Sequence, residues 1–129
     1  MKNNLMLIRE AFFFSQKQIA ELLQMNIYGY DSVEKGMISP SPLIIKMLSK
    51  IYAIPENFFE KEERELTSLL EGYTTEFKNL NQEERFKKAV ANLLGNTSLK
   101  GTFSRISKVR KRICEEIELE EAQELSQKS

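Results

Sequence analysis

The stretch that decides the fold is residues 15–36, which read SQKQIAELLQMNIYGYDSVEKG. In its first part, Ile19, Ala20 and Leu23 fall on one helical face, which predicts a short amphipathic helix. Ser15, followed three residues later by a glutamine, fits the capping box that opens such a helix. The stretch is therefore expected to begin with a capped helix that buries one face.

The second part of the stretch predicts a tight turn and another short helix. The turn is Gln24-Met25-Asn26, and asparagine is a residue type that caps a following helix. Tyr30 and Val33 are expected to point inward, and Gly36 suits the end of the helix. The exposed face of this second helix then consists of four residues: Ile27, Tyr28, Asp31 and Ser32. Two short helices joined by a tight turn can place the second helix in a DNA major groove, so this region is a candidate DNA reader.

A longer series of residues surrounds these two helices in a recognisable order. It comprises Ile8-Arg9, Ser15-Gln16, Ile19-Ala20, Asn26, Glu34-Lys35-Gly36 and Pro40, then a helix from Pro42 to Tyr52 and the segment IPENFF at 54–59. With this series, residues 5–59 resemble the lambda-repressor/Cro-type helix-turn-helix domain of the XRE family. The resemblance implies a five-helix DNA-binding domain over residues 1–60. It does not reach residues 61–129.

The resemblance also implies roles for individual residues. In that family the residues matching Arg9 and Glu34 form an ion pair between the first helix and the recognition helix; two unrelated surface charges are the alternative. A buried pair of this kind fixes geometry more surely than it adds stability. The family uses the glutamine matching Gln16 for phosphate contact and for bracing the recognition helix. Because helix N-termini attract anions, Gln16 and Lys17 are the leading phosphate contacts, and Lys35 lies in the family's second backbone-contact region.

Base reading would fall to the exposed face of the second helix, starting at Asn26. Ile27 can contact only a thymine methyl group, and Tyr28 can donate one hydrogen bond or stack on sugar. Asp31 can accept a hydrogen bond from cytosine but repels phosphate, and Ser32 completes the face. This surface is poor in donors. It is expected either to read a T-rich site through methyl contacts or to have drifted towards protein recognition.

The charge balance gives DNA binding little help. The chain has 19 basic and 19 acidic side chains. In residues 1–60 the count is six against six: Lys2, Arg9, Lys17, Lys35, Lys46 and Lys50 against Glu10, Glu21, Asp31, Glu34, Glu56 and Glu60. After Gly36 the family's usual basic residues are replaced by Met37 and Ile38. Since phosphate neutralisation supplies most non-specific affinity, strong binding would need a dimer, local clustering of lysines or another part of the chain.

The first helix is expected from Leu5 to Phe13. Three consecutive aromatic residues, Phe12, Phe13 and Phe14, lie at its C-terminal end. One helix face cannot bury all three. The resemblance implies burial at Phe14. Phe12 or Phe13 is therefore expected at the surface or in a contact.

Residues 61–129 predict further helices, which makes the chain all-α. Leu66, Leu70, Tyr73, Phe77 and Leu80 recur at heptad spacing. Another helix starts at Asn81 with Glu84 in a capping box. The last helix, about 103–125, places Ile106, Ile113 and Ile117 inward. We expect the residues of these apolar seams to form a dimer interface, and the region to carry a regulatory surface.

The last helix is divided by charge, with basic residues first and acidic residues second: Lys100, Arg105, Lys108, Arg110, Lys111 and Arg112, then Glu115, Glu116, Glu118, Glu120, Glu121 and Glu124. This order opposes the helix macrodipole. Antiparallel pairing of two copies would explain it and would favour a homodimer. Contact of the basic half with DNA phosphate is a second explanation, and a solvated charged face is the third.

Composition argues against catalysis. The chain has no histidine, which is the commonest general base and metal ligand. Its single cysteine, Cys114, has no partner for a disulfide and suits a reducing cytoplasm. No apolar run approaches the ~20 residues of a membrane span, and the first residues lack the pattern of a signal peptide. We expect no enzyme activity, no cofactor, no metal and no membrane association.

Together these features predict a dimeric transcriptional repressor of phage or mobile-element type. It would bind double-stranded DNA at an inverted repeat whose half-sites are spaced by about one turn, ~10 bp. The alternative is an antitoxin-like or adaptor module with a degenerate helix-turn-helix. In that case the C-terminal helices would bind a protein partner. Salt dependence separates the two, because phosphate contacts weaken steeply with salt.

Overall fold

The computed structural model describes residues 4–95 and 102–128, and these residues form helices and connecting segments without a strand. The elements are α1 (Leu5–Ala11), α2 (Gln16–Leu23), α3 (Ile27–Glu34), α4 (Pro42–Tyr52), the 3-10 helix η1 (Glu56–Glu60), α5 (Glu63–Lys78), α6 (Gln82–Leu94) and α7 (Thr102–Lys128). The predicted all-α fold class is therefore confirmed. Lys2 and Lys100, which entered the charge arguments, lie outside the described residues.

Side-chain caps set the start of four helices. Ser15 Oγ accepts from the backbone N–H of Gln18 at 3.2 Å, and the Gln18 side chain returns to Ser15, completing the predicted capping box. Asn26, Ser41 and Asn81 likewise cap α3, α4 and α6. Because each cap satisfies a backbone N–H that the helix leaves free, these starts follow from local sequence.

One continuous hydrophobic core joins all the helices. The inner faces of α1 to α4 supply Leu5, Ile8, Ile19, Leu23 and Leu48, among others. The same cluster continues into α5, α6 and the first half of α7. α4 packs against both α6 and α7, and α1 packs against α5. The C-terminal helices therefore complete the core of the N-terminal ones.

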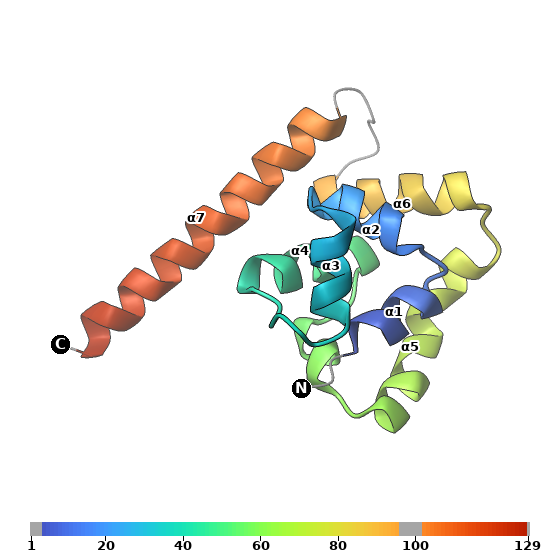
Figure 1. Cartoon of the computed structure of the whole chain (residues 1–129), viewed down its shortest axis with the longest axis horizontal. Helices are drawn as coiled ribbons and strands as arrows, with labels where there is room; N and C mark the ends of the chain where they lie inside the picture. Colours follow the sequence, from blue (N-terminus) through green and yellow to red (C-terminus); the bar gives the residue numbers. More distant parts are fainter. Residues whose placement is uncertain (1–3, 96–101, 129) are drawn as a thin grey trace.

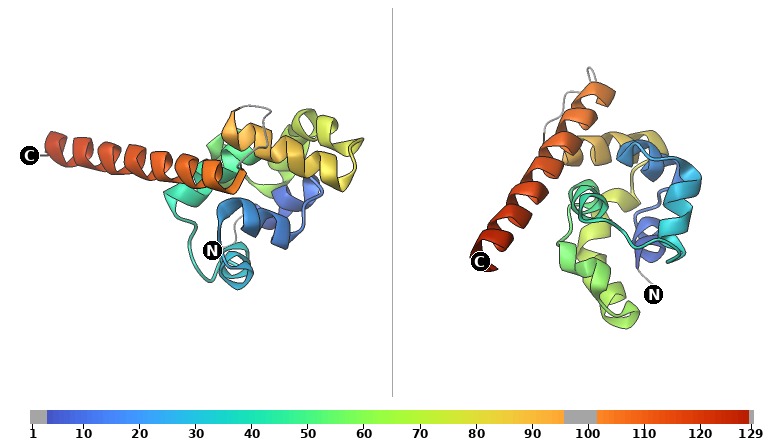
Figure 2. Two further views of the ribbon diagram at one scale, coloured as in Figure 1. Left: turned by 90° about the horizontal axis from the view of Figure 1, so that it is seen from above. Right: turned by 60° about the vertical axis from the view of Figure 1, so that its left-hand side comes forward.

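α7 lies along one side of this body, and its second half extends past it (Figures 1 and 2). Its first half is anchored by Ile106 and Ile113, which are buried against α4 and α6. Beyond Ile117 the described side chains are exposed, including Leu119. Only the first half of α7 is thus part of the core.

The residues predicted to form a dimer interface are mostly covered within the chain itself. Leu66, Leu70, Phe77, Ile106 and Ile113 are buried in the common core, and Leu80 and Ile117 are half-buried. Tyr73 stays partly exposed and packs edge-on against Phe58 of η1. The apolar faces that α1, α4 and η1 leave open are covered by α5 and α7 of the same chain. A dimer interface remains a prediction, and it would have to use other side chains.

The Phe12–Phe14 run is divided by a backbone turn. α1 ends at Ala11, two residues before the predicted end, and Phe13 adopts a left-handed conformation with φ of 67°. Phe12 and Phe14 consequently point into the core, where the Phe12 ring stacks on Tyr52 at 4.8 Å between centroids. Phe13 points outward, and the Arg85 guanidinium lies 4.5 Å from its ring centroid. The predicted exposed aromatic is therefore Phe13, and it does make a contact.

Candidate nucleic-acid interface

The outer face of α3 is the surface that the sequence singles out. Tyr28 is 80% exposed and Ile27 is 38% exposed, whereas Asp31 and Ser32 are half-buried. On the opposite face Tyr30, Val33 and Glu34 are buried. The inward and outward residues of α3 are thus distributed as predicted, with Asn26 exposed at its start as the cap.

An ion pair holds the inner face of α3 to α1. Arg9 Nε lies 2.7 Å from Glu34 Oε2, and the two side chains are only 11% and 1% exposed. Arg9 also donates through Nη1 to the carbonyl oxygen of Phe14 at 2.7 Å. Burial raises the pKa of the neighbouring Tyr30 and Tyr52 hydroxyls, so both stay neutral beside the pair. The pair expected from the resemblance is present, and it orients α3 relative to α1.

Gln16 connects the two carboxylates of α3. Its side-chain nitrogen donates to Asp31 Oδ1 at 2.8 Å and to Glu34 Oε1 at 3.1 Å. Since both acceptors are carboxylate oxygens, the amide can only be oriented with its NH₂ group towards them. Both side-chain donors of Gln16 are then engaged within the chain. The predicted bracing role fits this geometry, whereas a phosphate contact from Gln16 would have to use its backbone N–H.

Lys35 completes this set of contacts on the solvent side. Its Nζ lies 2.9 Å from Asp31 Oδ2, one turn back along α3. The hydrogen bond from Lys35, followed by that from Gln16, lowers the pKa of the Asp31 carboxyl, and Asp31 in turn raises the pKa of Lys35. We call the series Arg9–Glu34–Gln16–Asp31–Lys35 the polar chain. The family resemblance implied the Arg9–Glu34 pair and a bracing role for Gln16, but no sequence signal connected them to Asp31 and Lys35.

Few cations on this surface are free to meet phosphate. Lys17 is exposed in the first turn of α2 and has no ion-pair partner among the described residues, so it stays a candidate phosphate contact. Lys35 is paired with Asp31, and Lys46 lies 3.7 Å from Glu56. The Ser32 hydroxyl donates to the Tyr28 carbonyl at 3.0 Å, so its proton is also used within α3. Asp31 and Tyr28 are left as the principal outward polar groups of α3.

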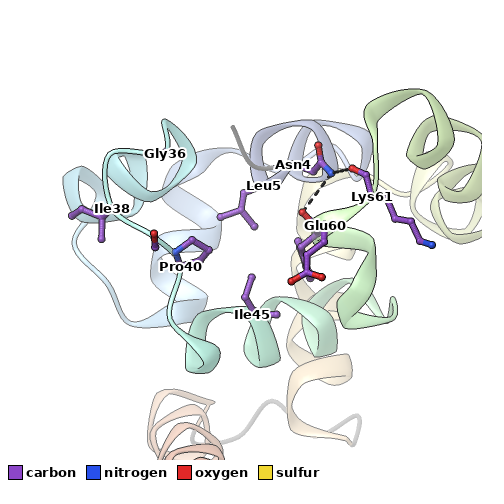
Figure 3. A pocket seen from close by; sticks show the side chains of 10 residues that line it. Asn4, Leu5, Gly36, Ile38, Pro40, Ile45, Glu60 and Lys61 are labelled. Carbon is purple, nitrogen blue, oxygen red and sulfur yellow. Dashed lines mark hydrogen bonds between the residues drawn. The ribbon is translucent and has the colours of Figure 1, made fainter. Parts of the chain in front are cut away.

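A cavity lies beneath the segment that follows α3. It has a volume of about 550 Å³ and separates this segment from the start of α1, from α4 and from η1 (Figure 3). Ile38, Pro40 and Ile45 give it apolar walls, and Glu60 lies at its edge. The Asn4 side chain donates to the carbonyls of Phe59 and Lys61, which fixes the far side. No sequence pattern indicated this cavity, because its walls come from four separate segments.

The basic half of α7 begins beside the α2–α3 turn. Gln24, at the end of α2, donates through Nε2 to the Ser107 hydroxyl at 2.8 Å. Lys108, Lys111 and Arg112 are exposed and have no ion-pair partner among the described residues. The glutamates at 115–124 are exposed as well. Arg105 and Arg110 are half-buried, so the acidic half and three of the described basic residues are the accessible part of the charge division.

Comparisons with known proteins found no matching family model, curated protein or solved structure. The interpretation of this surface therefore rests on the geometry of the chain. Within residues 4–95 and 102–128, no group of three or more acidic or cysteine side chains is placed to hold a metal ion. None of the described helices has the length and apolar character needed to cross a bilayer.

Proposed function

We propose that this chain is a sequence-specific DNA-binding transcriptional regulator of the lambda-repressor/Cro type, with α3 as its recognition helix. The observation that carries the proposal is the α2–α3 unit. Both helices are capped by side chains and are joined by residues 24–26. α3 is locked from behind by Arg9 while Ile27, Tyr28 and Asp31 face outward. Such a rigid helix with one free face is what major-groove reading requires.

We propose a dimer because the DNA-facing surface of one copy has little free positive charge. The outer face of α3 has little free positive charge, so one copy offers few phosphate contacts. Two copies bound to an inverted repeat would double the contacts of Lys17 and of the helix N-termini. We therefore propose a homodimeric repressor, of the kind that phages and mobile elements use.

Hydroxyl-radical footprinting of the DNA immediately upstream of the coding sequence tests this function. The expected pattern is two protected patches related by two-fold symmetry, about one helical turn or ~10 bp apart. The Ile27→Ala/Tyr28→Ala variant should lose the pattern at the same protein concentration. Uniform protection, or none, would contradict sequence-specific binding by a dimer.

A second function is favoured by one specific observation. Tyr28, Met37 and Ile38 are large, exposed side chains close together in sequence, in a region where DNA readers usually offer donors and cations. Such a surface suits an antitoxin-like or adaptor protein that contacts another protein through apolar groups. Binding to such a partner would persist at high salt, whereas phosphate-dependent binding would not.

A further inference from the structure

We propose that Asp31 is the specificity-determining residue of the α3 surface, and that it selects cytosine by accepting a hydrogen bond from its exocyclic amine. Gln16 and Lys35 act as positioning residues that hold the carboxylate for this contact. The inference rests on the proposed function, since it requires α3 to lie in the major groove. Its ligand is therefore one base edge within that groove.

The first support is that each carboxylate oxygen of Asp31 has its own internal donor. Gln16 Nε2 lies 2.8 Å from Oδ1, and Lys35 Nζ lies 2.9 Å from Oδ2. An ionised carboxylate offers about four acceptor sites. Two sites remain, and the side chain is 31% exposed on the outer face of α3. Asp31 can thus accept a further hydrogen bond without giving up its present ones.

The second support is that Gln16, the positioning residue on the inner side of Asp31, is itself held in place. The same Gln16 side-chain nitrogen also donates to Glu34 Oε1, and Glu34 is held by the buried guanidinium of Arg9. The orientation of Asp31 is therefore determined through three helices before any ligand arrives. A pre-oriented group loses little conformational entropy on binding, which favours discrimination between similar partners.

The third support is the chemistry of the base edges. In the major groove only cytosine N4 and adenine N6 carry donors, while guanine O6 and N7 and thymine O4 accept. In adenine the amine lies next to the N7 acceptor, which would face the second carboxylate oxygen and repel it. Cytosine has no acceptor beside its amine on this edge. An acceptor-only side chain therefore prefers cytosine over the other three bases.

Lys35 also removes the main objection to an acid in this position. An isolated carboxylate would repel the phosphates on either side of the groove, but here its charge is balanced by an ammonium group at 2.9 Å. Ser32 does not compete for the base edge, because its hydroxyl donates to the Tyr28 carbonyl. Ile27 lies one turn earlier on the same face, so a thymine methyl contact would be next to the cytosine.

The test is selection of duplexes from a randomised DNA library by the full chain and by Asp31→Asn. The wild-type protein should enrich cytosine at one position of each half-site. Asparagine presents one donor and one acceptor and pairs with adenine N6 and N7, so Asp31→Asn should shift that position to adenine. The preference at that position should change about tenfold or more. Gln16→Ala should weaken the cytosine preference without replacing it.

Glu21→Gln is the matched control. Like Asp31→Asn it removes one negative charge, but it does so at an exposed position on the neighbouring α2. It should retain the wild-type base preference at every position. Thermal unfolding followed by circular dichroism checks that each variant is folded. If the wild type selects a site and Asp31→Asn selects the same one, the inference is overturned while the proposed function stands. If the folded wild type enriches no sequence, the proposed function fails and the inference with it.

Discussion

The guanidinium of Arg9 and the carboxylate of Glu34 form a nearly solvent-free ion pair, with Nε and Oε2 2.7 Å apart. Arg9 belongs to α1 and Glu34 to the last turn of α3, so the pair joins two helices through residues that are 25 positions apart in sequence. Glu34 also accepts from Gln16, which places three of the N-terminal helices in one polar chain. The orientation of the exposed α3 face depends on this pair.

Removing the charge of Glu34 should destabilise the fold strongly. Glu34→Gln leaves the Arg9 guanidinium buried without its counter-charge, which costs about 3 kcal/mol or more of the unfolding free energy. Urea unfolding followed by circular dichroism measures the change. Glu10→Gln is the control, because Glu10 is 3.9 Å from the same guanidinium but mostly exposed, and its loss should cost under ~1 kcal/mol. Equal losses in both variants would contradict the structural role of the buried pair.

The Asp31 contacts should make stability depend on pH at the acid end. The pKa of Asp31 is lowered in the folded chain by hydrogen bonds from Lys35 and Gln16. A lowered folded pKa contributes stability above the unfolded value, about 3.9, and the contribution is lost as pH falls through the folded pKa. The wild type should therefore exceed Asp31→Asn in stability at pH 6, and this difference should shrink as pH falls below about 4.

Urea melts of both proteins across this range provide the measurement for Asp31. Glu21→Gln serves as the comparison, since removing that exposed acid leaves these hydrogen bonds intact. A difference between wild type and Asp31→Asn that stays constant, or grows, towards low pH would rule out the lowered pKa.

Two substitutions at Phe13 should have different effects. Phe13→Ala removes the ring beneath Arg85 and keeps a side chain at a φ of 67°, so it loses the cation–π contact without relieving the backbone. Phe13→Gly loses the same contact but accepts the left-handed conformation freely. The glycine variant should therefore be more stable than the alanine variant by about 1 kcal/mol in thermal or urea unfolding. An alanine variant as stable as the glycine variant, or more stable, would contradict the left-handed backbone conformation of residue 13.

The charge division of α7 predicts how the chain should self-associate. If the exposed basic and acidic halves of two copies pair antiparallel, sedimentation should show dimers at low salt that dissociate as salt rises. The triple variant Lys108→Glu/Lys111→Glu/Arg112→Glu should be monomeric under the same conditions. A wild type that stays monomeric at low salt, or a triple variant that still dimerises, would exclude this mode of pairing.

Apart from the Arg9–Glu34 pair, which the family resemblance implied, the features predicted correctly from sequence are the local ones. The helix starts at Ser15, Asn26 and Asn81 are each set by a side chain that bonds a backbone N–H within three residues. The inward positions of Tyr30 and Val33 follow from helical periodicity alone. Such signals need no knowledge of the rest of the fold.

The features that sequence reasoning missed depend on contacts between distant segments. The heptad spacing of Leu66, Leu70 and Phe77 suits a second copy as well as it suits the chain's own core, and only the packing of α5 against α1 decides between them. The Arg85–Phe13 contact and the Gln16–Asp31 hydrogen bond also join residues on separate segments of the chain. Their spacing in the sequence carries no periodic signal.

The most direct test of DNA reading by α3 is a fluorescence-anisotropy titration of the upstream duplex. It would compare wild type, Ile27→Ala/Tyr28→Ala and the control Leu69→Ala/Leu119→Ala, which removes exposed apolar side chains on α5 and α7. If Lys17 of each of two copies contacts a phosphate, affinity should fall roughly tenfold between about 50 and 200 mM salt. The α3 variant should bind about tenfold more weakly or worse, and the control should match wild type. Absent binding at low salt, or binding that all three proteins share equally, would contradict DNA reading through α3.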